Sequence, residues 1–141
     1  MTTMTKEEWA LVEKALGGIY GSVELEVDGR MVSFQRGLVG KDRLGCMTYI
    51  DGEFKGLWIS LEKEYPESKY LAPKSRYVYT LKRRNEMKKL GKKFLKEYGW
   101  DPEKKHEFVS PIWLNGAAIR RHYQKTFTAI KLTKVNGVDH P

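Results

Sequence analysis

The chain has 141 residues, a formal net charge of +8 at pH 7, 40% hydrophobic residues and 12% aromatic residues. This length is typical of one domain with a substantial core, and the hydrophobic fraction is too high for a disordered chain. No apolar run reaches the roughly 18 residues that a membrane-spanning helix needs, and no signal peptide is recognisable. With a lone cysteine, Cys46, and no export signal, the sequence predicts a reducing, cytoplasmic setting.

The first predicted element is a helix over residues 5–16. Thr5 and Glu8 have the spacing of a capping box, in which each side chain accepts a hydrogen bond from the other residue's backbone N–H. Trp9 begins an apolar stripe at helical spacing, and a glycine pair ends it. We interpret the stripe as the face that packs on the core.

A β-hairpin is predicted next, over residues 19–38. Its turn would be Asp28-Gly29, because this residue pair tolerates the positive φ angles of a two-residue turn. In that register Leu25 lies opposite Val32, and the apolar residues share one face. The agreement between turn and pattern predicts both the hairpin and its register.

A second hairpin is predicted over residues 44–61, with its turn at Asp51-Gly52. Its register would pair Cys46 with Leu57. Both faces of this hairpin are partly apolar. Either both faces are covered, as by flanking helices, or one is an exposed binding patch.

Residues 62–74 are interpreted as a loop, and residues 76–82 as a short strand or the first turns of a helix. From Lys82 to Tyr98 the pattern predicts one amphipathic helix, ended by Gly99 in the left-handed cap position. The predicted apolar face comprises Met87, Leu90, Phe94 and Tyr98.

The C-terminal third is predicted to contain a strand over residues 106–113, a helix over 116–125 capped by Asn115, and a last strand over 127–135. Residues 138–141 are expected to be a frayed tail, because no further strand follows. The whole chain is therefore predicted to be a single α+β domain. Its antiparallel sheet would be built from two consecutive β-hairpins, with about three helices.

Positive charge is concentrated in residues 69–105, which hold thirteen Lys or Arg against four Asp or Glu. The basic side of the predicted helix in this segment could contact phosphates, contact an acidic protein surface, or simply be solvated. These three interpretations stay open. Nearby tyrosines are candidates for stacking on bases or for core packing: Tyr77, Tyr79 and Tyr98. The candidate contact residues for nucleic acid or an acidic partner are Lys82, Arg83, Arg84, Lys88, Lys89, Lys92, Lys93, Lys96, Arg120 and Arg121.

Patterns for catalysis are sparse. Cys46 is predicted to be a buried, inert thiol, and the three histidines lie far apart, so no catalytic residue, cofactor or metal site is assigned. Asp101, Glu103 and Lys105 resemble part of a restriction-type nuclease site, in which carboxylates hold Mg²⁺. That family places the Glu-x-Lys pair on a strand, whereas here it follows a helix end and a proline. A solvated turn is the preferred interpretation.

Two segments, residues 70–99 and 111–132, resemble small uncharacterised proteins encoded by bacteriophages and prophages. The resemblance includes no catalytic motif and transfers no site residues. It implies a mobile-element context inside a bacterial host cell. Proteins of this kind act on nucleic acid, or they block host nucleoprotein machines, as anti-CRISPR proteins do with Cas nucleases.

The leading hypothesis is a non-enzymatic basic binding protein acting on a nucleic-acid-handling machine, as an anti-CRISPR-like inhibitor of a Cas nuclease. In this hypothesis the basic residues contact acidic protein or bound RNA, and an apolar hairpin face anchors the complex. The alternative is a nucleic-acid-binding accessory protein for phage replication, recombination or regulation, and a metal-dependent nuclease is third. No membrane partner is expected. The last strand and the second hairpin each offer a surface for a homodimer.

Overall fold

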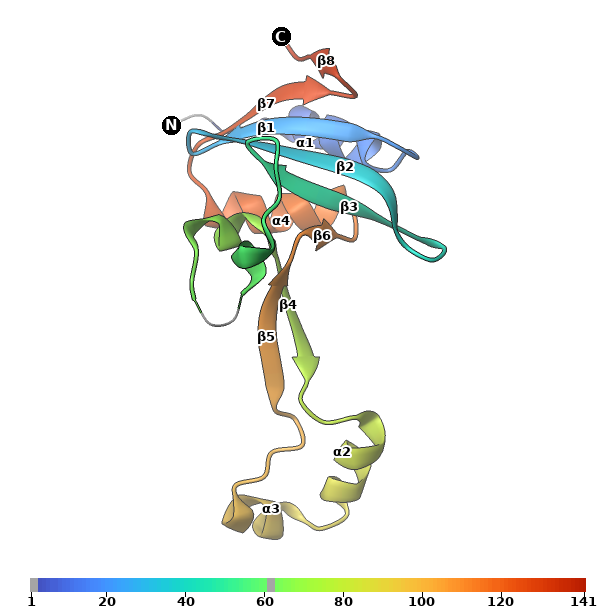
Figure 1. Ribbon diagram of the computed structural model, residues 1–141, viewed down its shortest axis with the longest axis vertical. Coiled ribbons are helices and arrows are strands. Elements are labelled where there is room, and N and C mark those ends of the chain that lie inside the picture. The colour runs from blue at the N-terminus through green and yellow to red at the C-terminus, as the bar shows by residue number, and fades with distance from the viewer. Residues whose placement is uncertain (1–2, 61–62) are drawn as a thin grey trace. The chain divides into compact units, whose positions relative to one another are not determined.

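The computed structural model describes residues 3–60 and 63–141. The chain forms two compact units (Figure 1). The main unit comprises Met1–Ala72 and Val109–Pro141, and the basic unit comprises Pro73–Phe108. The predicted α+β class with a mostly antiparallel sheet is confirmed. The single domain predicted from the sequence has no boundary at either junction between these units.

A six-stranded antiparallel sheet is the frame of the main unit, with the strand order β6-β3-β2-β1-β7-β8. Every neighbouring pair in this order is antiparallel. The strands are β1 (Ser22–Val27), β2 (Arg30–Gly40), β3 (Arg43–Ile50), β6 (Ile112–Trp113), β7 (Ile130–Val135) and β8 (Val138–Asp139).

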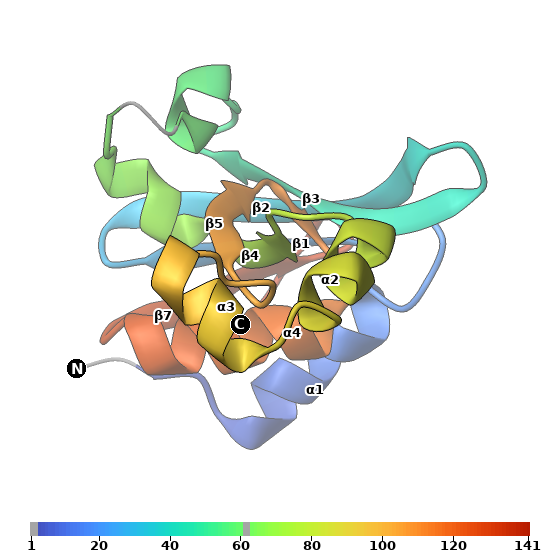
Figure 2. The same ribbon diagram turned by 90° about the horizontal axis from the view of Figure 1, so that it is seen from below.

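Two helices, α1 (Lys6–Ala15) and α4 (Gly116–Thr126), cover one face of this sheet (Figures 1 and 2). The predicted capping box of α1 is confirmed, since the Thr5 hydroxyl accepts from the Glu8 backbone N–H and the Glu8 carboxylate accepts from that of Thr5. The Asn115 side chain caps α4 as predicted. Local cap chemistry therefore sets where both helices begin.

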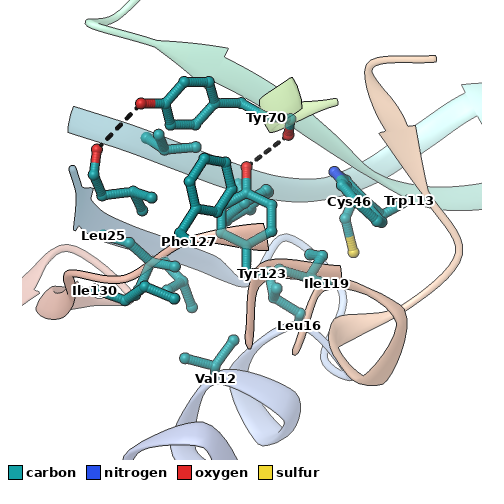
Figure 3. Packing of buried hydrophobic residues seen from close by; sticks show 14 of the residues in the cluster. Val12, Leu16, Leu25, Cys46, Tyr70, Trp113, Ile119, Tyr123, Phe127 and Ile130 are labelled. Carbon is teal, nitrogen blue, oxygen red and sulfur yellow. Dashed lines mark hydrogen bonds between the residues drawn. The ribbon is translucent and has the colours of Figure 1, made fainter. Parts of the chain in front are cut away.

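The core of the main unit lies between the sheet and these helices (Figure 3). Leu25 of β1 and Phe34 of β2 are fully buried, and Tyr123 of α4 packs edge-on against Phe34. The Tyr123 hydroxyl donates to the Tyr70 carbonyl at 2.6 Å, and the Tyr70 hydroxyl donates to the Val27 carbonyl at 3.3 Å. These two bonds tie the segment that precedes the basic unit into the core.

The first predicted hairpin is confirmed between β1 and β2. Asp28 and Gly29 have φ angles of 47° and 85°, as a two-residue turn of this type requires. Leu25 lies opposite Val32, in the predicted register. Strand β1 begins only at Ser22, so the predicted extension of the hairpin by three further residues is wrong.

The turn of the second predicted hairpin is confirmed, but its strand pairing is wrong. Asp51 and Gly52 have φ angles of 52° and 83°, and Ile50 and Glu53 exchange backbone hydrogen bonds across them. No return strand follows in residues 54–60.

Strand β3 instead forms a hairpin with β2. Cys46 lies opposite Arg36 of β2 on one side and Trp113 of β6 on the other, so both edges of β3 are occupied at that point. The residues predicted to return as a strand form a short 3-10 helix, η1 (Gly56–Ile59). The two consecutive hairpins of the sheet therefore share β2.

The C-terminal residues 138–141 are not a frayed tail. Asn136 and Gly137 have φ angles of 52° and 79°, which makes them a hairpin turn, and β8 pairs with β7 beyond it. The His140 Nε2 atom lies 2.9 Å from the Glu8 carboxylate at the start of α1. A strand of two residues is too short to show the alternation of apolar and polar side chains by which a strand is recognised in a sequence.

The basic unit is built mainly from a two-stranded sheet and two short helices. It contains α2 (Leu81–Lys88), α3 (Lys92–Tyr98) and most of β4 (Ala72–Tyr77) and β5 (Lys105–Ser110). Ala72 of β4, and Val109 and Ser110 of β5, are counted in the main unit.

No helix over residues 3–60 or 63–141 has both the length and the apolar content needed to span a membrane.

The single helix predicted over residues 82–98 is wrong, because the structure divides it into α2 and α3. Gly91 separates the two with a φ angle of 87°, a conformation that cannot continue a right-handed helix. Met87 and Leu95 are buried, whereas Leu90 of the predicted apolar face is 49% exposed. The break therefore changes which side chains each helix turns toward solvent.

Candidate functional site

The basic unit carries almost the whole net charge of the chain. Its 36 residues, Pro73–Phe108, hold twelve Lys or Arg against five Asp or Glu, a formal charge of +7. The chain as a whole carries +8. Positive potential is thus concentrated on one short, folded segment, where it would attract a polyanion.

Eight of the ten candidate contact residues lie in the basic unit, on α2, on α3 and between them. The other two, Arg120 and Arg121, lie on α4 of the main unit. Arg120 is engaged there, since its guanidinium lies 2.8 Å from the Glu13 carboxylate. The structure therefore brings eight of these residues into one unit and places the remaining pair in the other.

Arg84 is held inside the basic unit rather than facing solvent. Its guanidinium lies 3.4 Å from the centroid of the Tyr77 ring. It donates to the Pro102 carbonyl at 3.0 Å and to the Glu103 carboxylate at 3.1 Å. Only 11% of its side-chain surface is exposed. Arg84 thus joins α2 to the turn after α3.

Two more cations have acidic partners in this unit. The Lys88 ammonium lies 2.9 Å from the second oxygen of Glu103, and the Arg83 guanidinium lies 3.8 Å from the Glu86 carboxylate. The hydrogen bond from Lys88, with the charges of Lys88 and Arg84, lowers the pKa of Glu103 below its ordinary value. These pairs neutralise part of the charge that the sequence places on α2.

Five lysines of α2, α3 and their connection are exposed and have no ion pair with any residue in 3–60 or 63–141. Their ammonium groups are therefore available to an external anion. We call these the open lysines: Lys82, Lys89, Lys92, Lys93 and Lys96.

Three aromatic side chains form an exposed cluster at the end of α3. Phe94, Tyr98 and Trp100 are 37%, 58% and 39% exposed. Their ring centroids are 4.6 Å apart for Phe94 and Tyr98, 5.6 Å for Tyr98 and Trp100, and 6.0 Å for Phe94 and Trp100. We call this group the aromatic cluster.

The sequence does not predict the aromatic cluster as a group, although it marks Tyr98 as a candidate for base stacking. One helical period continued through Gly91 places Phe94 and Tyr98 on a core-facing stripe. Gly91 was the feature of the sequence that could have indicated the cluster, because a glycine can end one helix and begin another. In the new helix that begins after Gly91, Leu95 and not Phe94 faces the interior. The predicted left-handed cap at Gly99 is confirmed, with a φ angle of 68°.

The three tyrosines considered for base stacking differ in their surroundings. Two cations lie over the Tyr77 ring, Arg84 at 3.4 Å and Lys105 at 4.9 Å from its centroid. Tyr79 is half-buried. Tyr98 is the most exposed of the three, and it belongs to the aromatic cluster.

The string Asp101, Glu103 and Lys105 is engaged in contacts within the basic unit. The Asp101 carboxylate accepts from the backbone N–H of Glu103 at 2.9 Å, and the Glu103 side chain carries the two ion pairs described above. Lys105 lies over Tyr77. Within the described residues, no three His, Cys, Asp or Glu side chains gather as a metal site would need.

Cys46 is buried, as predicted, in the core of the main unit. Burial raises the pKa of its thiol, which disfavours the nucleophilic thiolate. Comparisons with protein-family models, with curated proteins and with solved structures found no match to this chain.

Proposed function

We propose that this chain is a non-enzymatic binding protein, of the type that phages encode, which acts on a nucleic-acid-handling machine and contacts its nucleic acid through the basic unit. The observation that carries the proposal is the set of five open lysines. They lie on a unit of charge +7 whose remaining helix cations are largely paired. A polyanion is the ligand class that such a surface attracts.

The chemistry of lysine sets the kind of contact. An ammonium group neutralises a phosphate as a point charge and displaces its counterions, but it does not read base edges in a fixed geometry. Arginine supplies the bidentate contact that identifies guanine, and Arg84 uses its donors inside the unit. Binding through the open lysines is therefore indifferent to sequence and sensitive to salt.

The aromatic cluster favours nucleic acid over an acidic protein surface as the partner. A unit that exposes both aromatic rings and lysines offers a contact for each part of a nucleotide, the flat base and the phosphate. An anti-CRISPR-like inhibitor that contacts the guide RNA of a Cas nuclease is the narrower form of this proposal. A replication, recombination or regulation accessory protein uses the same surface on free nucleic acid.

The test compares two variants with the same loss of charge. In the first, Lys89, Lys92, Lys93 and Lys96 of the basic unit become Gln. In the matched control, four exposed lysines of the main unit that form no ion pair with residues 3–60 or 63–141 become Gln: Lys6, Lys14, Lys41 and Lys131. Binding to a fluorescent oligonucleotide is measured by anisotropy at about 50 mM salt.

We expect the basic-unit variant to lose most of its affinity and the control variant to keep most of its own. Equal losses would contradict contact through the basic unit, and the absence of binding by the unmodified protein would overturn the proposal. Capture of a Cas nuclease only when its guide RNA is present would support the inhibitor form. Mg²⁺-dependent DNA cutting that Glu103→Gln abolishes would favour the nuclease instead.

A further inference from the structure

Contact with phosphates does not explain why the aromatic cluster is exposed. Phe94, Tyr98 and Trp100 expose ring surface to water, although aromatic side chains normally contribute their large apolar area to a core or an interface. Phosphate contact through lysines does not use such rings. The cluster therefore indicates a second kind of contact made by the same unit.

The local backbone holds the cluster in place. Gly99 ends α3 in the left-handed conformation, and the Trp100 backbone N–H then donates to the Leu95 carbonyl at 2.8 Å. This bond folds Trp100 back on the helix, where its ring lies within 6.0 Å of the Phe94 ring. Because the rings already contact one another, a ligand that stacks on them orders little that was free before.

The charge of the basic unit indicates which kind of ligand could bind at the aromatic cluster. Lys93 precedes Phe94 by one residue and Lys96 precedes Tyr98 by two, so at about 100° per residue these lysines lie on other sides of α3 than the rings. A ligand that suits both features needs regularly spaced negative charge and accessible flat faces. A base-paired duplex buries the faces of its bases in the stack, whereas a single strand exposes them.

We propose that the basic unit binds single-stranded nucleic acid, with unpaired bases stacked on Tyr98 and Trp100 and with phosphates held by the open lysines. The inference rests on the proposed function and names the class of nucleic acid that the basic unit binds. Stacking tolerates any base, because every base has a π face, so the preference is for unpaired strands and not for a sequence.

Trp100 gives this proposal a direct signal. The other three tryptophans, Trp9, Trp58 and Trp113, are only 2%, 4% and 3% exposed, whereas Trp100 is 39% exposed. A base that stacks on Trp100 quenches its fluorescence, and buried tryptophans of the main unit cannot be reached in the same way. The Trp100→Phe variant keeps a ring for stacking and removes the signal.

The experiment uses three ligands of equal phosphate number: an oligothymidine, an abasic strand of the same length, and a duplex. Affinity is measured by competition against a labelled strand, and Trp100 quenching is recorded in parallel. We expect the oligothymidine to bind about tenfold more tightly than the abasic strand and to be the strongest quencher. Equal affinity for all three, without quenching, would overturn single-strand stacking while leaving phosphate contact intact.

Paired variants separate stacking from folding. Tyr98→Ala should weaken oligothymidine binding about tenfold and leave binding of the abasic strand unchanged. Tyr98→Phe keeps the ring and should bind both strands as the unmodified protein does. A loss of both affinities in Tyr98→Ala and Tyr98→Phe alike would contradict the proposal. A dimer in sedimentation that Trp100→Ala dissociates would show that a second copy covers the cluster, and would overturn it too.

Discussion

The guanidinium of Arg84 lies 3.1 Å from the carboxylate of Glu103, and this pair connects α2 to the turn that follows α3. The second oxygen of Glu103 lies 2.9 Å from the Lys88 ammonium. One carboxylate thus engages two cations of the basic unit. The network holds together a unit with few buried apolar side chains on its helices, Met87 and Leu95.

Removing the Glu103 charge should loosen the basic unit. Glu103→Gln cannot pair with both cations, so amide hydrogen exchange over α2 and α3 should become faster than in the unmodified protein. Glu97→Gln is the matched control, since it removes one exposed charge from α3 and should leave exchange unchanged. Slow exchange in both variants would contradict a structural role for Glu103.

The same network predicts an acid-dependent loss of order. The folded-state pKa of Glu103 is lowered from 4.5, so its stabilising contribution is present above that value and is lost as the pH falls through the folded-state pKa. Amide exchange over α2, corrected for its intrinsic pH dependence, should therefore accelerate on acidification below about pH 4.5. The Glu103→Gln variant should lack this transition.

The sequence predicts the main unit best where a short-range rule specifies the structure. The turn at Asp28-Gly29 fixes the register of the first hairpin, and Thr5 and Asn115 fix two helix starts. Such rules do not specify which strands pair when the strands are far apart in the sequence. Strand β3 pairs forward across Asp51-Gly52 at a single bridge, between Ile50 and Glu53, and otherwise pairs with β2 along its length and with β6 at Cys46 and Met47.

The sequence shows where positive charge is concentrated, because a formal charge count needs no fold. It does not distinguish Arg84, which is buried by Tyr77 and Glu103, from an open lysine such as Lys96. That distinction depends on the break at Gly91, which one glycine in a helical pattern does not by itself reveal.

Tyr123 should make the main unit sensitive to alkali. Burial raises the pKa of Tyr123 well above 10, so its contribution to stability is complete below pH 10 and is lost as the pH rises through the folded-state pKa. Tyr123→Phe leaves the Tyr70 carbonyl without its donor and should cost about 1–3 kcal/mol at pH 7.

The free energy of unfolding, measured with urea at pH 7 and above pH 10, tests this point. The difference between the unmodified protein and Tyr123→Phe should shrink at the higher pH. Tyr20→Phe, at a side chain 79% exposed, serves as the control and should follow the unmodified protein. A constant difference for Tyr123→Phe would contradict the account.

Gly116 should not tolerate a side chain, because α1 and α4 approach closely there. A Cβ atom at this position would lie 2.9 Å from the Cα of Glu13. Gly116→Ala should therefore destabilise the main unit by about 1–3 kcal/mol, despite the better helix propensity of alanine. Gly56→Ala meets nothing within 4 Å and should change stability little. Thermal unfolding compares the two.

The C-terminal return strand should contribute measurably to stability. Deleting residues 138–141 removes the pairing of β8 with β7 and the contact between His140 and Glu8. We expect a loss of about 1 kcal/mol, which lowers the melting temperature by about 2–4 °C for a chain of this size. His140→Gln should account for only part of that shift. An unchanged melting temperature after the deletion would contradict the role assigned to β8.

The most direct test of nucleic-acid contact through the basic unit is the salt dependence of single-strand binding. The logarithm of the binding constant falls linearly with the logarithm of salt concentration, with a slope of about −0.7 per neutralised phosphate. The variant with Gln at positions 89, 92, 93 and 96 should have a slope shallower by about three, and the variant with Gln at positions 6, 14, 41 and 131 should keep the original slope. Equal slopes for the two variants would contradict the account.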